Sequence, residues 1–223
     1  MEQVCRMRAP MTQDIRDIDD LARIARERAS GERTLIALAG PPASGKSTLA
    51  EALVAELSKT DPAATLVPMD GFHLDNSVLY SRGLFERKGA PETFDAAGFV
   101  AAMQRLKAGG EVILPTFDRA RDNSVAGAIV VPDAARFVVV EGNFLCFDEE
   151  PWSALSQLWD LSCYLDVPVE TLRERLIQRW LDHGLDPEAA RTRAEENDLA
   201  NAVRVSDAIG APDIRIAAAL DIE

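Results

Sequence analysis

Apolar residues along this chain follow two patterns, short unbroken runs and longer stretches with helical spacing. The short runs end in glycine or aspartate and predict buried strands at 34–40, 64–70, 136–142 and 161–166. Two weaker strand candidates lie near 202–205 and 213–216. Because near-continuous apolar strands are typical of parallel sheets covered on both faces, the pattern predicts an α/β fold.

The longer stretches predict the helices that cover such a sheet. Apolar residues recur at helical spacing in 12–30, 46–58 and 167–184, and a further helix is expected from Asp186-Pro187 to about Leu199. Thr12 and Gly31 suit the two ends of the first helix, and Pro168 and Gly184 suit the ends of the third.

Residues 71–131 follow neither pattern clearly and are rich in Gly, Pro, Asp and Arg. We expect this segment to be an insertion that lines a substrate pocket, within a single domain that spans residues 1–223. The helical region 167–200 is expected to form a lid over the same pocket.

Charge and composition narrow the class of partner. The formal net charge is −13, from 24 basic and 37 acidic residues, and no basic block is longer than two residues. Nucleic-acid binding is therefore disfavoured, because it depends on Lys and Arg that neutralise phosphates. No apolar stretch reaches 18 residues, and Cys5, Cys146 and Cys163 are widely spaced. We expect a cytoplasmic protein without membrane spans or disulfides; a homodimer is one compatible oligomeric state.

The segment GPPASGKST at 40–48 carries the most specific chemistry. Gly40, four further residues and Gly45-Lys46-Ser47 match the P-loop formula, between a predicted strand and a predicted helix. Lys46 is expected to bridge the β- and γ-phosphates, and the Ser47 hydroxyl to ligate Mg²⁺. A chance glycine turn is the alternative. The predicted nucleotide-binding residues are Gly40, Ala43, Ser44, Gly45, Lys46, Ser47 and Thr48.

Two acids end predicted strands and complete the outline of a phosphoryl-transfer site. Parallel sheets bind ligands at the carboxyl ends of their strands, where Asp70 and Glu141 both fall. Asp70 suits the group that orients or deprotonates an acceptor hydroxyl, and Glu141 suits the magnesium shell. The alternative for each is an ordinary polar residue at a strand end or a helix cap.

Five segments occur in an order that resembles a known group of kinases. They are GPPASGKST, DGFHLDN, RKGAPETFD, PTFDRARDNSVAGAI and VVVEGNF. The set resembles the P-loop kinases that include uridine kinase, pantothenate kinase and phosphoribulokinase, over roughly residues 33–217. It is most similar to a bacterial branch known as nucleoside/nucleotide kinase-like or fructose transport system kinase (fructokinase). His73 stands where uridine kinases carry a tyrosine.

The resemblance implies a P-loop NTPase three-layer sandwich that uses ATP and Mg²⁺ and phosphorylates a small hydroxyl-bearing acceptor. It implies that Asp70 is the catalytic base and that Glu141 lies near the metal. A sugar such as fructose is the first expectation for the acceptor, and a nucleoside or a pantothenate-like alcohol comes next.

Further polar residues are candidates for the pocket and the lid. His73, Arg87 and Arg119 are expected to contact the acceptor, with Asp118 orienting Arg119; a solvated loop or a structural ion pair is the alternative. Lys88, next to Arg87, could also hold an anionic or polyhydroxyl substrate, and Arg87 is favoured of the two. Arg175 and Arg179 share a helix face, and in related kinases arginines of the matching lid helix close over the phosphates. Asn197 and Asp198 are expected near the nucleotide base or at a helix end.

Two other classes of nucleotide-binding protein are weighed against the kinase. A GTPase is disfavoured because no Asn-Lys-x-Asp stretch follows a strand. A regulatory ATPase without a small acceptor has a different signature, an open face in place of a pocket that contains Asp70.

Overall fold

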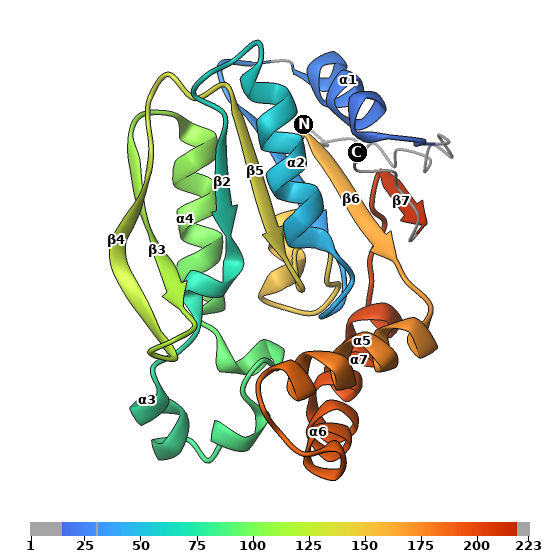
Figure 1. The fold of residues 1–223 in the computed structure, drawn as a ribbon. Helices are drawn as coiled ribbons and strands as arrows, with labels where there is room; N and C mark the ends of the chain where they lie inside the picture. Colours follow the sequence, from blue (N-terminus) through green and yellow to red (C-terminus); the bar gives the residue numbers. More distant parts are fainter. Residues whose placement is uncertain (1–14, 30, 218–223) are drawn as a thin grey trace.

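The computed structural model describes residues 15–29 and 31–217, and these contain a five-stranded parallel sheet (Figure 1). The strand order is β2-β5-β1-β6-β7. The strands are β1 (Thr34–Ala39), β2 (Thr65–Pro68), β5 (Phe137–Gly142), β6 (Leu161–Asp166) and β7 (Ile214–Ala217). The predicted parallel α/β sheet is confirmed, and β5 lies between β1 and β2, so that their carboxyl ends meet at one edge.

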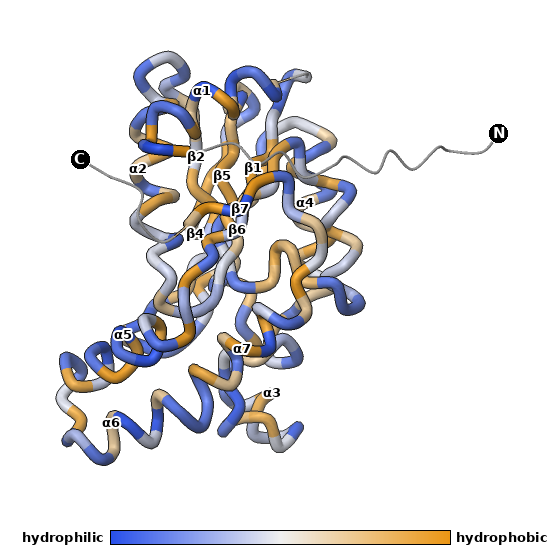
Figure 2. Tube along the Cα trace, turned by 90° about the vertical axis from the view of Figure 1, so that its right-hand side faces the viewer, coloured by the Kyte–Doolittle hydropathy of each residue, from blue (hydrophilic) through white to orange (hydrophobic). Residues whose placement is uncertain are grey.

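Alternate residues of the central strand face two separate cores, which makes the fold a three-layer sandwich. Ile36 and Leu38 pack with helices α1 (Ile18–Arg28) and α2 (Lys46–Ser58). Leu35 and Ala37 face the opposite side, where α4 (Ala96–Ala108) supplies Phe99, Met103 and Leu106. Figure 2 shows hydrophobic residues along the central strands. Burial on both faces explains why these strands appear as unbroken apolar runs.

The segment after β2 is more regular than its composition predicts. It runs through the 3₁₀ turn η1 (Met69–Phe72), α3 (Asn76–Ser81), the turns η2 (Phe85–Arg87) and η3 (Pro91–Thr93), α4, and the antiparallel hairpin β3 (Val112–Asp118) and β4 (Asn123–Val131). The expectation of an irregular stretch is therefore wrong for α4 and the hairpin. The hairpin strands are exposed on one side, and so they lack the unbroken apolar runs of the central sheet.

The chain between β6 and β7 is almost entirely helical. It forms α5 (Val169–Asp182), α6 (Pro187–Arg193), the π-helix η5 (Ala194–Leu199) and α7 (Ala200–Asp207). The strand expected near 202–205 is wrong, because Asn201, Ala202 and Val205 form the buried face of α7. The helix expected to end near Leu199 instead continues through η5 into α7. Figure 1 shows this helical region beside α3, beyond the carboxyl ends of the strands.

The ends of the first helix also differ from expectation. Asp17 is the N-cap of α1, and its side chain accepts a hydrogen bond from the backbone N–H of Asp20. The helix ends at Arg28, with Ala29 as its C-cap. Thr12, the expected cap, lies outside the described residues. Cys163 is buried and Cys146 partly buried, each as a free thiol, whereas Cys5 lies outside the description. No helix in the described ranges is long and apolar enough to cross a membrane.

Candidate active site

The loop between β1 and α2 has the geometry of an anion cradle. Ala43 and Gly45 adopt positive φ values of 63° and 94°, and no side chain caps the N-terminus of α2. The Ser44 hydroxyl oxygen is buried without a hydrogen-bond partner. A Cβ added to Gly40 would lie 2.8 Å from that oxygen, so the loop has no room for a larger residue there. Uncapped backbone N–H groups at a helix N-terminus are suited to phosphate oxygens.

Ser47 and Glu141 form an oxygen-rich pair beside this loop. The Ser47 hydroxyl donates to Glu141 Oε2 at 3.2 Å, and Glu141 is only 6% exposed at the end of β5. Burial raises the pKa of Glu141, and the nearby Lys46 ammonium opposes that rise. Burial likewise lowers the pKa of Lys46, with Glu141 and Asp70 acting in the opposite direction. The two groups therefore stabilise each other's charged forms in a poorly solvated site.

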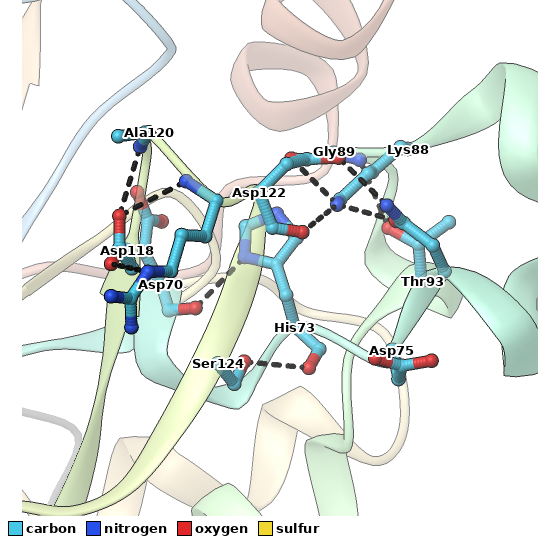
Figure 3. A network of polar contacts seen from close by, with 12 residues as sticks. Asp70, His73, Asp75, Lys88, Gly89, Thr93, Asp118, Ala120, Asp122 and Ser124 are labelled. Atoms are coloured by element: carbon cyan, nitrogen blue, oxygen red, sulfur yellow. Dashed lines mark hydrogen bonds and ion pairs between the residues drawn. The ribbon is translucent and has the colours of Figure 1, made fainter.

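Asp70 lies in the η1 turn directly after β2, where the hairpin β3–β4 packs against it. A Cβ on Gly71 would approach the Pro115 carbonyl oxygen to 2.4 Å, so only glycine allows the turn to pack this closely against β3. Arg119, from the end of the hairpin, donates to Asp70 Oδ2 at 3.0 Å. The expected role of Asp118 in orienting Arg119 has no counterpart in the structure, because Asp118 accepts from the backbone of Ala120 and Arg121 (Figure 3).

His73 is enclosed by aromatic rings three residues after Asp70. Its ring centroid lies 4.0 Å from that of Phe94 and 4.7 Å from that of Phe117. Its Nδ1 is 2.9 Å from the carbonyl oxygen of Asp70 (Figure 3). Burial lowers the pKa of His73. Because the carbonyl can only accept, Nδ1 carries the proton and Nε2 of the neutral ring is a hydrogen-bond acceptor.

One cavity of about 680 Å³ joins the P-loop to the segment 69–131. Of the residues predicted for the site, Ala43, Gly45, Lys46, Ser47, Thr48, Asp70, His73, Arg119 and Arg179 line it. Gly40, Ser44, Arg87, Arg175 and Glu141 are not part of its lining. Glu141 lies behind Ser47, and Arg175 donates to the carbonyls of Ala43 and Ser44, so it braces the loop.

Lys88, and not its neighbour Arg87, lines the cavity. Arg87 is 56% exposed and pairs with Glu92 at 2.6 Å, whereas the Lys88 side chain is only 12% exposed and lines the cavity. The Lys88 ammonium contacts Asp122 Oδ1 at 2.7 Å and lies 5.1 Å from the centre of the Phe117 ring. Lys88 was named beside Arg87 from the sequence as a residue that could hold an anionic or polyhydroxyl substrate, with Arg87 favoured; Asp122 was not considered. No local pattern marks the Lys88–Asp122 pair, because their pairing depends on the hairpin reaching η2.

The helical region between β6 and β7 reaches the same cavity. Trp180 Nε1 donates to Asp198 Oδ2 at 2.7 Å, and the guanidinium carbons of Arg179 and Arg193 lie 5.8 and 5.4 Å from the Trp180 ring centre. Burial raises the pKa of Asp198. Asn197 Nδ2 donates to the Lys88 carbonyl at 3.1 Å. The π-helix η5 thus connects this helical region to the segment that carries Lys88.

The fold, the P-loop and the acids at the strand ends together define a P-loop kinase, and comparisons with known proteins agree. The family model described as Phosphoribulokinase / Uridine kinase family matches residues 35–189, more than half of the chain. A crystal structure of a Silicibacter protein, provisionally named a fructose transport system kinase, is 48% identical with a TM-score of 0.85, and the match covers 89% of this chain and 98% of that one.

Two curated relatives carry names from other parts of the family. A protein of Schizosaccharomyces pombe provisionally named uridine kinase is 34% identical, over 90% of each chain. A pantothenate kinase of Parvibaculum lavamentivorans is 34% identical, and the match covers 78% of this chain and 58% of that protein. The chain belongs to the phosphoribulokinase/uridine kinase family and is a kinase that transfers phosphate to a hydroxyl group. Membership implies ATP use and a small-molecule substrate.

Proposed function

We propose that this protein transfers the γ-phosphoryl group of ATP to a hydroxyl of a small polar metabolite, with a sugar as the favoured acceptor. The observation that carries the proposal is a single cavity of about 680 Å³ lined both by Lys46 of the P-loop and by the Asp70 carboxylate. A cavity of this volume holds a small ligand next to a nucleotide phosphate.

The P-loop end of the cavity is the nucleotide side. The uncapped N-terminus of α2 and the partnerless Ser44 hydroxyl fit phosphate oxygens, and Lys46 lies at the start of the same helix. The Ser47 hydroxyl and the Glu141 carboxylate fit Mg²⁺, which prefers oxygen ligands and keeps several waters. When bound, the metal neutralises charge on the transferred phosphoryl group. Arg179, in the lid region, also lines the cavity and is suited to the same neutralising role.

Asp70 is the group that would orient the acceptor hydroxyl or accept its proton. The Gly71 turn holds it against β3, and Arg119 holds one of its oxygens at 3.0 Å. The second oxygen is then available to an acceptor hydroxyl, which general-base catalysis requires within hydrogen-bond distance. His73, with Nε2 as an acceptor, offers a second contact for a substrate hydroxyl.

The name of the Silicibacter structure supports a sugar such as fructose as the acceptor. The names of the curated relatives support a nucleoside or a pantothenate-type alcohol as the second choice. A regulatory ATPase without a small acceptor is the alternative of another class. The presence of Asp70 in the wall of a concave pocket, where a regulator needs only an open face, favours the kinase.

ADP release with Mg-ATP, measured across fructose and other sugars, ribose, ribitol, uridine, cytidine and pantothenate, tests the proposal. Turnover that rises with one acceptor and yields its phosphomonoester supports a kinase of that acceptor class. Slow ADP release at one rate with every acceptor, together with tight ATP binding, favours the regulatory ATPase.

A further inference from the structure

The part of the cavity wall that segment 69–131 contributes, called here the acceptor end, has its positive charges paired within the protein. Lys88 is the more buried of the two cations there, and its ammonium group has three acceptors within 3.1 Å. They are Asn76 Oδ1 at 2.7 Å, Asp122 Oδ1 at 2.7 Å and the Asp122 carbonyl oxygen at 3.1 Å. Because an ammonium group has three N–H donors, Lys88 has none left for a ligand.

Asp122 is held in an unusual backbone conformation that serves this pairing. Its φ is +54°, a left-handed value that aspartate tolerates better than most residues. The conformation lets its carbonyl and its carboxylate both reach Lys88 (Figure 3). Its Oδ2 also accepts from Asn76 Nδ2 at 2.9 Å. Burial works against ionisation, yet the hydrogen bonds from Lys88 and Asn76 lower the pKa of Asp122. Both carboxylate oxygens are therefore occupied and the side chain is charged.

The second cation at this end, Arg119, is balanced by Asp70 at 3.0 Å. The remaining polar groups there add no positive charge, since His73 is neutral and Glu86 is acidic. The other cations of the cavity wall, Lys46, Arg179 and Arg193, belong to the P-loop and the helices that follow β6. Lys88 and Arg119, the two cations that segment 69–131 contributes to the cavity wall, are thus each in contact with a carboxylate.

We infer that the acceptor is an uncharged, hydroxyl-rich molecule, such as a free sugar or a nucleoside, and that the Lys88–Asp122 pair excludes carboxylates and phosphomonoesters. This inference rests on the proposed function and narrows its acceptor. An anion placed at this end would lose part of its hydration and would meet the Asp70 and Asp122 carboxylates as well as the two cations, so it would gain no net attraction. A neutral polyol can instead use the aromatic walls of Phe94 and Phe117 and the Nε2 acceptor of His73.

Matched acceptors that differ mainly in charge provide the test. The sharpest pair is pantothenol and pantothenate, in which a hydroxymethyl group replaces a carboxylate at nearly the same size. Fructose with fructose 6-phosphate, and uridine with uridine 5′-monophosphate, extend the comparison. Affinity is measured by calorimetry on the full chain saturated with Mg²⁺ and a non-hydrolysable ATP analogue, and phosphoryl transfer is measured separately with ATP.

Asp122→Asn is the informative variant because it keeps the shape and the left-handed conformation but leaves Lys88 unbalanced. We expect the ratio of anion affinity to neutral-acceptor affinity to rise about tenfold, the order expected for one unit charge a few ångströms away in a partly solvated cleft. Asp118→Asn is the matched control. Asp118 lies on the same hairpin, outside the cavity wall, and holds a turn that asparagine can also hold.

The outcomes separate this inference from the proposed function. Tighter binding of the neutral member of each pair in the wild type, with the ratio shifted by Asp122→Asn and not by Asp118→Asn, supports the inference even if no phosphate is transferred. Tighter binding of the anionic member overturns it, while transfer to that member would leave the kinase proposal standing. Failure of every neutral acceptor to bind also overturns it.

Discussion

The two ends of the cavity are built in different ways. The nucleotide end is made by nine consecutive residues, 40–48, that run from the end of β1 into the first turn of α2, with two positive φ angles inside the loop itself. The acceptor end is made by residues far apart in the chain: Arg119 lies 49 positions from Asp70, and Lys88 lies 34 positions from Asp122. A local motif can be recognised from sequence, whereas the acceptor end depends on how η1, η2 and the β3–β4 hairpin pack together.

The two ends also differ in whether their polar groups have partners within the protein. At the nucleotide end, the Ser44 hydroxyl has no hydrogen-bond partner and no side chain caps the start of α2. The acceptor end has charges that already satisfy one another. Changes at the first end are therefore expected to affect phosphate binding and rate with every acceptor. Changes at the second end are expected to affect transfer and acceptor choice, with nucleotide affinity preserved.

The largest effect is expected for Lys46→Ala. Loss of the P-loop ammonium should lower turnover by about a thousandfold or more with every acceptor, because charge on the transferred phosphate is left without its preorganised partner. ADP release with Mg-ATP measures this. Lys59→Ala, at the far end of the same helix where Lys59 pairs with Glu56, is the control and should be silent. Near-normal turnover of Lys46→Ala would remove the phosphate role from this loop.

Asp70→Asn should separate the two ends most clearly. The variant keeps the size of the side chain but cannot accept a proton, so the transfer rate is expected to fall about a hundredfold to ten-thousandfold while ATP affinity changes little. Single-turnover transfer and ATP titration measure the two quantities. Asp75→Asn, which alters the N-cap of α3 outside the cavity wall, is the control, since asparagine also caps helices. An unaltered transfer rate in Asp70→Asn would rule out a base at this position.

Glu141→Gln should have a smaller effect, confined to the nucleotide end. The amide oxygen can still accept from the Ser47 hydroxyl, but the negative charge is lost. We expect the Mg²⁺ concentration for half-maximal activity to rise about tenfold, as for other residues that support metal ligands. The exposed Glu111→Gln provides the control. Identical Mg²⁺ titrations for wild type and Glu141→Gln would mean that Glu141 is structural.

The smallest effect is expected at His73, in the pH dependence of stability. Because burial lowers the pKa of His73 in the folded state, the unfolded chain binds its proton first as the pH falls. This residue should therefore leave stability unchanged above about pH 6.5 and reduce it as the pH falls below that value, by a few degrees in Tm at most. His73→Gln should flatten this part of the Tm profile. The chain has two histidines, so His183→Gln is the natural control, and an equal flattening in both variants would contradict the assignment.

Features that depend on neighbouring residues could be predicted from the sequence. The unbroken apolar runs predicted the parallel strands, because burial on both faces leaves no polar positions in them. The P-loop was recognisable because its glycines, lysine and hydroxyl all lie within eight consecutive residues, 40–47. The strand-end rule predicted that Asp70 and Glu141 meet at one edge, and the register of β5 against β1 and β2 bears out that placement.

Which side chains meet at the acceptor end depends on long-range packing and could not be predicted from the sequence. It pairs Arg119 with Asp70 instead of Asp118, and it buries Lys88 while leaving its neighbour Arg87 exposed. It also places 202–205 in a helix, where the apolar positions suggested a short strand. The physical reason is the same in each case. Ion pairs and half-buried elements depend on partners brought together over tens of residues, and neither charge pattern nor periodicity records that long-range packing.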